Sequence, residues 1–229
     1  MTTAAATIEL VRVDLDAVLP EVLATLTTSG EREEAARRRN PADARRFLAR
    51  RAAMRANLAR MLRRSPREIA LGKDALGRPL VPDSGIHVSQ SSRGGVMIAA
   101  FCTDRPVGCD VEEVRSDVDV DAVAELCLGP TERRMLRTAP PPLRQRLFYD
   151  CWTRKEAYLK ATGTGMIVDM ASFETTRRAG PATRWGRVEW ASETWSPLPG
   201  FAAAVVARGT DWRIQHCPDV TMLGFGLAA

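Results

Sequence analysis

Apolar positions recur along this chain with two periods, one typical of helices and one typical of strands. Over residues 43–64, Phe47, Met54, Leu58, Met61 and Leu62 return at helical spacing and predict a helix. A second helix is predicted over about 145–160, ending before the glycines of "GTG". The preceding "TAPPPLRQ" (138–145) is expected to be a loop, because its proline run stops any helix that crosses it.

Strand-like patterns follow each helical region. "GVMIAAFCTDRPVGCDVE" (95–112) predicts two strands joined near 104–106, and "RWGRVEW" and "GFAAAVVA" predict later strands. "DVDVDAVAELC" and "GPTERRML" each begin a short helix, and "ALGRPLVPDSG" (75–85) is a turn-rich crossing. Because helices followed by strands occur twice, we predict an α+β fold of two similar halves, 1–106 and 107–229, with a seam near 105–110.

The composition excludes several classes of protein. The longest apolar runs, 96–102 and 201–207, are too short to span a bilayer, and the N-terminus lacks the pattern of a signal peptide, so we expect a cytoplasmic protein without membrane attachment. The five cysteines form no C-x-x-C pair and only two histidines accompany them. A zinc site or disulfide framework is therefore not expected, and the cysteines are interpreted as small buried residues.

Charge is distributed unevenly along the chain. Residues 31–67 contain 13 arginines and four acids, whereas residues 110–132 contain eight acids and one arginine, within a net charge of +5. Solvated charged faces are the commoner cause of such asymmetry. An anionic ligand held through a metal would also explain it, and the arginine-rich segment alone would suit a nucleic-acid-binding protein.

Two arginines of the first helix lie at the edge of its apolar stripe. Relative to Phe47, a rotation of about 100° per residue puts Arg51 at ~40° and Arg55 at ~80°. Their stems could carry the charges out to water. Alternatively, their guanidinium groups meet a buried phosphate or carboxylate.

The second helix places a carboxylate among apolar side chains. Relative to Trp152, Glu156 falls at ~40° and Lys160 at ~80°. A carboxylate there needs a partner, which could be Lys160, another protein group or a metal ion. Asp110 and Glu112 share one face of a predicted strand, and three such carboxylates would form an oxygen site suited to Mg²⁺.

Two segments together resemble the signatures of one family. "VGCDVEEV" (107–114) and "WTRKEAYLKATGTG" (152–165) resemble the paired signatures of the Sfp-type 4′-phosphopantetheinyl transferases. "LGRPLVPD" (76–83) is similar to the family's G-K-P crossing, and "LPGFAAAVVA" (198–207) to its late strand. The resemblance covers nearly the whole chain.

This resemblance implies a pseudo-twofold pair of α+β halves with coenzyme A (CoA) in the cleft between them. The implied reaction moves the phosphopantetheine arm of CoA onto a serine of an apo acyl or peptidyl carrier protein and releases 3′,5′-ADP. The implied metal, Mg²⁺ with Mn²⁺ as the alternative, would be held by Asp110, Glu112 and Glu156. Glu156 is the candidate base, and Lys160 and Lys155 would stabilise phosphate charge.

The implied CoA-binding residues come from both halves: Arg51, Arg55, Arg78, Gln90, Ser92, Arg93, Asp110, Lys155 and Lys160. Glu132 matches a further acidic position of the cleft. The family normally has S-H-S before the first signature, whereas this chain has "HVSQSSRGG" (87–95). Gln90 or Ser92 stands in place of that histidine, and Arg93 or His87 could supply the missing charge.

Two other functions remain open at this stage. One is nucleic-acid binding through the arginine-rich helix, which would leave the three carboxylates without a role. The other is a family member that binds CoA or a carrier but has lost transfer. We favour the transferase, acting as a monomer with no nucleic acid or membrane. A basic or apolar rim that faces the carrier protein is expected to include Arg133 and Arg134, and fatty-acid, polyketide and peptide-synthetase carriers are all compatible with the sequence.

Overall fold

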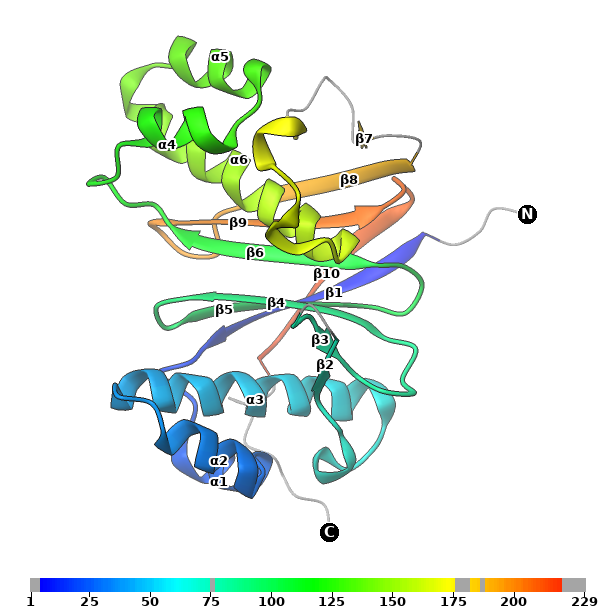
Figure 1. The fold of residues 1–229 in the computed structure, drawn as a ribbon. Coiled ribbons are helices and arrows are strands. Elements are labelled where there is room, and N and C mark those ends of the chain that lie inside the picture. The colour runs from blue at the N-terminus through cyan, green and yellow to red at the C-terminus, as the bar shows by residue number, and fades with distance from the viewer. Residues whose placement is uncertain (1–4, 75–76, 176–181, 186–187, 220–229) are drawn as a thin grey trace.

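The chain folds into four stacked layers, helices, sheet, sheet and helices, in a computed structural model (Figure 1). The model describes residues 5–74, 77–175, 182–185 and 188–219. The predicted α+β class is confirmed.

The first sheet has the strand order β10-β1-β5-β4. Its strands are β1 (Ala6–Asp14), β4 (His87–Arg93), β5 (Val96–Cys102) and β10 (Trp212–Cys217). Neighbours are antiparallel except β1 and β10, which run parallel. Its outer face is covered by α1 (Pro20–Leu26), α2 (Ser29–Ala36) and α3 (Pro41–Leu62), with Met54 and Leu58 of α3 buried against Val13 and Met97.

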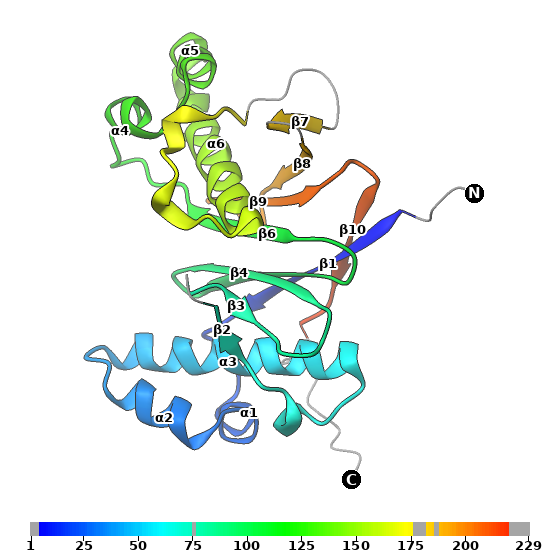
Figure 2. The same ribbon diagram turned by 45° about the vertical axis from the view of Figure 1, so that its right-hand side comes forward.

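The second sheet is antiparallel, with the order β6-β9-β8-β7. Its strands are β6 (Val107–Glu113), β7 (Ala182–Trp185), β8 (Val188–Trp195) and β9 (Phe201–Arg208). The helices α4 (Val120–Cys127), α5 (Pro130–Thr138) and α6 (Pro141–Thr162) lie over its outer face (Figure 2). Short 3-10 turns η1 (Pro66–Glu68), η2 (Gly165–Ile167) and η3 (Met170–Ser172), and a small hairpin of β2 (Gly72–Lys73) and β3 (Pro79–Leu80), complete the fold.

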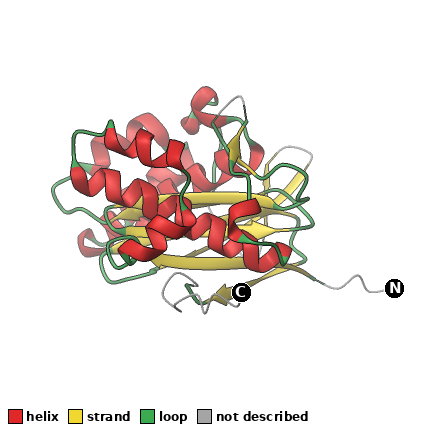
Figure 3. Ribbon diagram, turned by 90° about the horizontal axis from the view of Figure 1, so that it is seen from below, coloured by secondary structure: helices red, strands yellow, loops and turns green. Residues whose placement is uncertain are grey.

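The inner faces of the two sheets form a common apolar core, so the halves do not have separate interiors. Ile98 and Leu10 from the first sheet pack with Val107, Cys109 and Val205 from the second. Seen along the stack, the strands lie behind the covering helices (Figure 3).

One glycine brings β6 and α6 into unusually close contact. A Cβ added to Gly108 would lie 1.9 Å from the carbonyl oxygen of Ala157 and 2.6 Å from the backbone nitrogen of Ala161. No other residue fits between strand and helix at this point. The contact therefore sets Asp110, two residues further along β6, beside the last turns of α6.

Several predicted elements are confirmed, with changes at their ends. The helix predicted over 43–64 is α3, and the two strands predicted over 95–112 are β5 and β6. The loop predicted over 138–145 was wrong, because α6 already begins at Pro141. Proline is tolerated in the first helical turn, where its missing N–H would have no partner.

One strand of the second half, β10, belongs to the sheet of the first half. The division at 106/107 falls in the connection between β5 and β6, but β10 crosses back and pairs with β1 in the first sheet. The strand predicted at "RWGRVEW" corresponds to the end of β7 and the start of β8, with 186–187 outside the described residues. All five cysteines are unpaired, and all but Cys217 are buried.

Candidate active site

A cavity of about 480 Å³ opens where the two halves meet. Its walls come from α3, the β2–β3 hairpin, β4, the C-terminal half of α6 and the turn that follows it. Its polar side chains are Arg51, Lys73, Arg78, Ser89, Gln90, Glu156 and Lys160, and Leu159 and Pro79 provide apolar surface. Four cationic side chains against one carboxylate make it suited to an anion.

The two signature segments meet in a single ion pair. Lys160 of α6 lies 2.6 Å from Oδ1 of Asp110 on β6, and the same oxygen accepts a 2.7 Å hydrogen bond from the Ser91 hydroxyl. Burial works against the charge of Lys160, but Asp110 outweighs it and raises the pKa of Lys160. Asp110 is only 3% exposed, and its second oxygen, Oδ2, has no hydrogen-bond partner in the described protein.

Two further carboxylates lie near this pair. Burial raises the pKa of Glu156, and the negative charge of Asp110 adds to the effect despite Lys160. The pKa of Glu112 is raised by the same two causes, against the pull of Arg93 at 3.5 Å. Lys160 pairs with Asp110 rather than with Glu156, whose carboxylate has no hydrogen bond or ion pair among the described residues.

The arrangement of these carboxylates suits a metal ion only in part. Within the described residues, no three acidic, histidine or cysteine side chains are gathered so as to hold a metal by themselves. Mg²⁺, however, is usually bound through one or two carboxylates together with substrate phosphates and water. The buried, unpartnered Oδ2 of Asp110 fits such a partial site, because a bound cation would satisfy it.

The two α3 arginines meet a buried carboxylate rather than water. Glu31 of α2 accepts hydrogen bonds from Arg51 and, at 3.0 Å, from both terminal nitrogens of Arg55. Arg55 is buried and also donates to the carbonyls of Leu26 and Ile69. Arg51 lines the cavity and Arg55 does not, so the structure does not bring Arg55 to the expected CoA site.

Lys155 and Glu132 likewise lie away from the cavity. They form a fully buried ion pair with 2.9 Å between nitrogen and oxygen. Lys155 also donates to the carbonyls of Met170 and Phe173, and Glu132 accepts from Thr175. Lys155 and Glu156 are neighbours in sequence but point to different sides of α6, and only Glu156 lines the cavity.

The segment in place of S-H-S forms β4, in which Ser89 and Ser91 face β6. Ser89 and Gln90 line the cavity, and Oε1 of Gln90 is buried without a partner in the described structure. Ser91 donates to Asp110, whereas Ser92 accepts a 3.4 Å hydrogen bond from Arg50. Arg93 lies beside Glu112.

Two further candidates, His87 and Arg78, lie near this site. His87 lies in an adjoining cavity of about 370 Å³ that shares Arg78 and Pro79 with the first. Arg78 lies against the end of α6, where its Nη1 is 3.2 Å from the place of a Cβ on Gly163.

Sequence reasoning missed several residues of this site. Lys73 and Ser89 line the cavity, Ser91 binds Asp110, and Glu31 holds Arg51. Recognising β4 as a strand would have assigned Ser89 and Ser91 to the face of Asp110. No local signal links Glu31 to Arg51.

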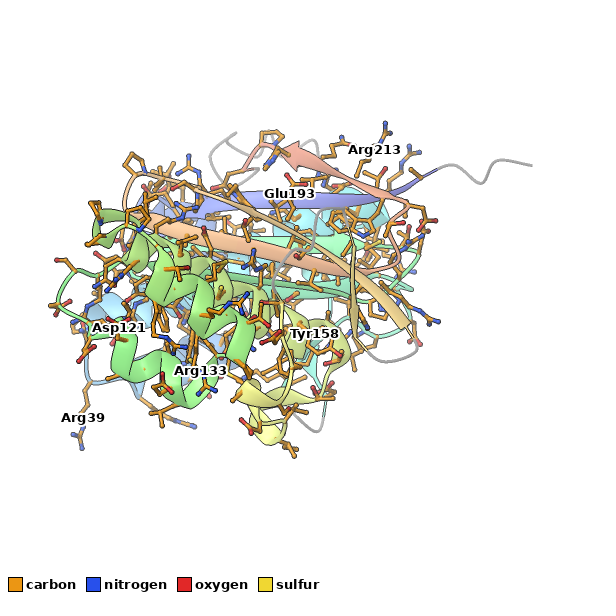
Figure 4. The ribbon with its side chains drawn as sticks, turned by 90° about the horizontal axis from the view of Figure 1, so that it is seen from above. Arg39, Asp121, Arg133, Tyr158, Glu193 and Arg213 are labelled. Carbon is orange, nitrogen blue, oxygen red and sulfur yellow. The ribbon has the colours of Figure 1, made fainter. Side chains whose placement is uncertain are left out.

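Most of the acidic segment from 110 to 132 is a solvated surface. Asp121 and Arg133 project from α4 and α5 on the upper face of the molecule (Figure 4). Arg133 pairs with Glu125 at 2.9 Å, and Asp121 lies 3.8 Å from Arg144. Exposed pairs of this kind contribute little free energy. Asp110 differs from them because it is buried and pairs with Lys160, a residue of the cavity wall.

Comparison with known proteins identifies the family. A model of the 4′-phosphopantetheinyl transferase superfamily matches residues 106–206. Over 217 residues the chain is 31% identical to the 4′-phosphopantetheinyl transferase HetI of Nostoc sp., an alignment that covers 90% of each chain. The chain therefore belongs to the 4′-phosphopantetheinyl transferase superfamily, and it is an enzyme of that activity.

Other relatives carry the same activity in their names. The chain is 30% identical to the 4′-phosphopantetheinyl transferase psf-1 of Bacillus pumilus, over 67% of this chain and 65% of the relative. It is 24% identical to the 4′-phosphopantetheinyl transferase Sfp of Bacillus subtilis, over 85% and 86%. Within its described part, the structure contains no helix with the length and apolarity needed to cross a membrane.

Proposed function

We propose that this enzyme transfers the 4′-phosphopantetheine arm of CoA to a serine of an apo acyl or peptidyl carrier protein and releases 3′,5′-ADP. The observation that carries the proposal is the pair of Lys160 and Asp110 at the wall of a cationic cavity, with one carboxylate oxygen left unpartnered. A pyrophosphate-containing substrate matches both the charge and the position of this cavity.

The cavity arginines and lysine are proposed to bind the phosphates of CoA. Arg51 and Arg78 offer planar, multiple donors that suit phosphate oxygens, and Lys73 adds a mobile positive charge. Gln90 adds a neutral amide, which can hydrogen-bond a phosphate without contributing charge. Arg93 is occupied by Glu112, and Ser92 faces Arg50, so we assign neither a direct contact.

We propose that Asp110, Glu112 and Glu156 hold a divalent cation, Mg²⁺ or Mn²⁺. When bound, such an ion neutralises pyrophosphate charge and makes the phosphorus more electrophilic. Lys160 lies where it can stabilise charge on the departing 3′,5′-ADP, and its raised pKa keeps it protonated at neutral pH. Asp110 keeps the Lys160 ammonium directed at that position.

Glu156 is proposed as the general base for the carrier serine. Its pKa is raised from its ordinary value by burial and by Asp110, which brings the group nearer to the pKa that favours proton transfer at neutral pH. Its oxygens carry no competing hydrogen bond within the described protein. The carboxylate is therefore free to accept a proton directly or through a bound water.

All the described walls of the cavity come from one chain, which supports the proposal of a monomeric enzyme. Light scattering tests it: the mass of one chain would agree with the proposal, and the mass of a dimer would contradict it. We also propose a cytoplasmic location, where CoA is available, to be checked by fractionating cells. Nucleic-acid binding is disfavoured, because Arg51, Arg55, Arg46 and Arg60 of the basic helix are engaged by acidic side chains.

The test is intact-mass spectrometry of apo carrier proteins incubated with the enzyme, CoA and Mg²⁺. We expect a gain of one phosphopantetheine mass, abolished by Glu156→Ala and retained by Glu113→Ala. Glu113 is an exposed acid next to Glu112 on β6 and serves as the matched control. Absence of any gain over fatty-acid, polyketide and peptide carriers, with CoA binding intact, would instead indicate a protein that binds CoA without transferring its arm.

A further inference from the structure

The buried carboxylate of Glu31 lies outside the cavity and yet contacts the one α3 arginine that lines it. Glu31 lies in the first turn of α2 and closes a capping box with Thr28, from whose backbone N–H it accepts a hydrogen bond at 2.9 Å. This local bond fixes the carboxylate before any arginine is considered. Both its oxygens then accept from the guanidinium groups of Arg51 and Arg55.

The charge of this carboxylate is held firmly. Burial alone would raise its pKa, but hydrogen bonds from Arg55, from the Thr28 backbone and from Arg51 outweigh burial and lower the pKa of Glu31 to about 2. Glu31 is therefore ionised at any pH at which the enzyme works. The arginines consequently meet a constant negative charge.

Arg51 and Arg55 use this carboxylate in different ways. Arg55 makes two hydrogen bonds to Glu31 and also donates to the carbonyls of Leu26 at 2.6 Å and Ile69 at 3.2 Å, so each of its three nitrogens is engaged by the protein. Arg51 donates through Nε to Glu31 and through Nη2 to the Leu71 carbonyl at 3.0 Å. Its Nη1 has no protein partner in the described residues, and the side chain lines the cavity.

The same bonds hold the strand that forms the neighbouring cavity wall. The carbonyls of Ile69 and Leu71 accept hydrogen bonds from Arg55 and Arg51, and Leu71 directly precedes Gly72 and Lys73 of the lining. A single carboxylate on α2 thus fixes a cavity arginine and the backbone that carries a cavity lysine.

We propose that Glu31 is a positioning residue for CoA binding, acting through Arg51. It holds the Arg51 guanidinium with one end directed into the cavity, so that binding a phosphate does not have to immobilise a free side chain. This inference rests on the proposed function, because it requires Arg51 to contact the anionic substrate. Losing such pre-organisation would weaken CoA binding by roughly threefold to tenfold.

The test is a double-mutant cycle of Glu31→Gln and Arg51→Ala, read as the CoA dissociation constant by calorimetry with Mg²⁺ present. We expect each single variant to weaken CoA binding, and Glu31→Gln to have no further effect once Arg51 is Ala. The melting temperature is measured in parallel, since Glu31→Gln also removes the partner of buried Arg55. Additive effects of the two changes would overturn the proposal, since a general loss of structure acts independently of Arg51.

Two controls separate the possible failures. Asp16→Asn removes the carboxylate, in the β1–α1 connection, that binds Arg46 of α3. Neither residue of this exposed pair lines the cavity, so the change should leave CoA binding unchanged. If Glu31→Gln fails to fold, Glu31→Asp keeps the charge with a shorter reach and should still weaken CoA binding. Unchanged affinity in folded Glu31→Asp and Glu31→Gln, with Arg51→Ala affected, overturns the role of Glu31. Unchanged affinity in Arg51→Ala refutes the phosphate contact itself.

Discussion

The carboxylate of Glu156 is the residue at which the needs of folding and of catalysis conflict. It is partly buried beside Asp110, and no described side chain neutralises it directly. Groups placed in this way are common at active sites, where the arrangement that suits the reaction is not the one that suits stability. Asp110, in contrast, has the compensating contact of Lys160.

Replacing Glu156 by glutamine should therefore stabilise the enzyme while abolishing transfer. The pKa of Glu156 is higher in the folded protein than its ordinary value of 4.5, so folding favours the protonated form, and ionisation at pH 7 lowers the free energy of unfolding. We expect Glu156→Gln to raise that free energy by less than about 1 kcal/mol, because water screens part of the effect.

The stability difference between Glu156→Gln and the wild type should depend on pH in a defined direction. The advantage of Glu156→Gln should shrink as the pH falls through the folded pKa toward 4.5, where the wild-type carboxyl is protonated as well. Urea unfolding at pH 7 and pH 5 measures both values. A glutamine variant that is less stable than wild type at pH 7 would contradict this account of the site.

At residue scale, the sequence predicted which charged residues lie at apolar boundaries, but it predicted less well which partners their side chains contact. The helical wheel identified Glu156, Arg51 and Arg55 as charges at an apolar boundary, and the structure places all three in partly or fully buried surroundings. It could not identify their partners, because Glu31 is 24 residues from Arg55 and Asp110 is 50 from Lys160. The strand pattern and the helical wheel singled out Asp110 and Lys160, whereas the family resemblance added Lys155, which pairs with Glu132 away from the cavity.

At the scale of elements, two different faces of α6 contact two different regions of the protein. One face presents Glu156 and Lys160 to the cavity, and another holds the 170–175 segment through Lys155. Tyr158 packs between Phe173 and Trp190, with ring centroids 5.1 Å and 5.5 Å away, and extends this second contact. The position of the cavity wall after α6 therefore depends on residues that do not touch the cavity.

Lys155→Met should separate structure from substrate binding. The change leaves Glu132 buried without its cation, which typically costs about 3–5 kcal/mol of unfolding free energy. Because Lys155 does not line the cavity, the folded fraction of the variant should bind CoA within about twofold of wild type. Urea denaturation and calorimetry below the midpoint measure the two quantities. A large loss of CoA affinity with unchanged stability would restore the direct role suggested by the family resemblance.

The element pattern was predictable where hydrophobic periodicity is strong. α3, β5, β6 and β9 were found from the sequence because each has a long apolar stripe or a continuous apolar run. The helix predicted for α6 was too short, because a proline run usually ends a helix, although proline is also common in a helix's first turn. β1 and β4 were missed, the latter because "HVSQSSR" is polar and its inner positions carry small serines instead of apolar side chains.

At the scale of the whole molecule, the shared core makes the two halves interdependent. The inner face of the first sheet, with Ile8, Leu10, Ile98 and Ala100, is covered by the second sheet. Parallel pairing of β10 with β1 adds a second link, which local sequence patterns do not reveal, because strand pairing over 200 residues leaves no local signal. The division at 106/107 thus marks a change of sheet rather than a pair of independent units.

A fragment of residues 1–106 is therefore expected not to fold on its own. It would expose the inner face of its sheet to water and would lack β10. We expect no cooperative thermal transition by circular dichroism and poorly dispersed NMR signals, whereas the full chain melts cooperatively. A sharp transition in the fragment would mean that the first half is an autonomous domain.

Because β10 lies near the end of this sequence, a newly synthesised chain exposes an unpaired edge of β1 until β10 has been made. β1 emerges from the ribosome long before β10, so one of its edges stays unpaired until residues 212–217 follow. At about 5–20 residues per second, that edge stays open for on the order of ten seconds or more of synthesis. An open strand edge can pair with strands of other chains. Truncation anywhere before β10, by a premature stop or by a protease, leaves the edge permanently open, so interrupted products of this gene should be preferred targets for chaperones and degradation.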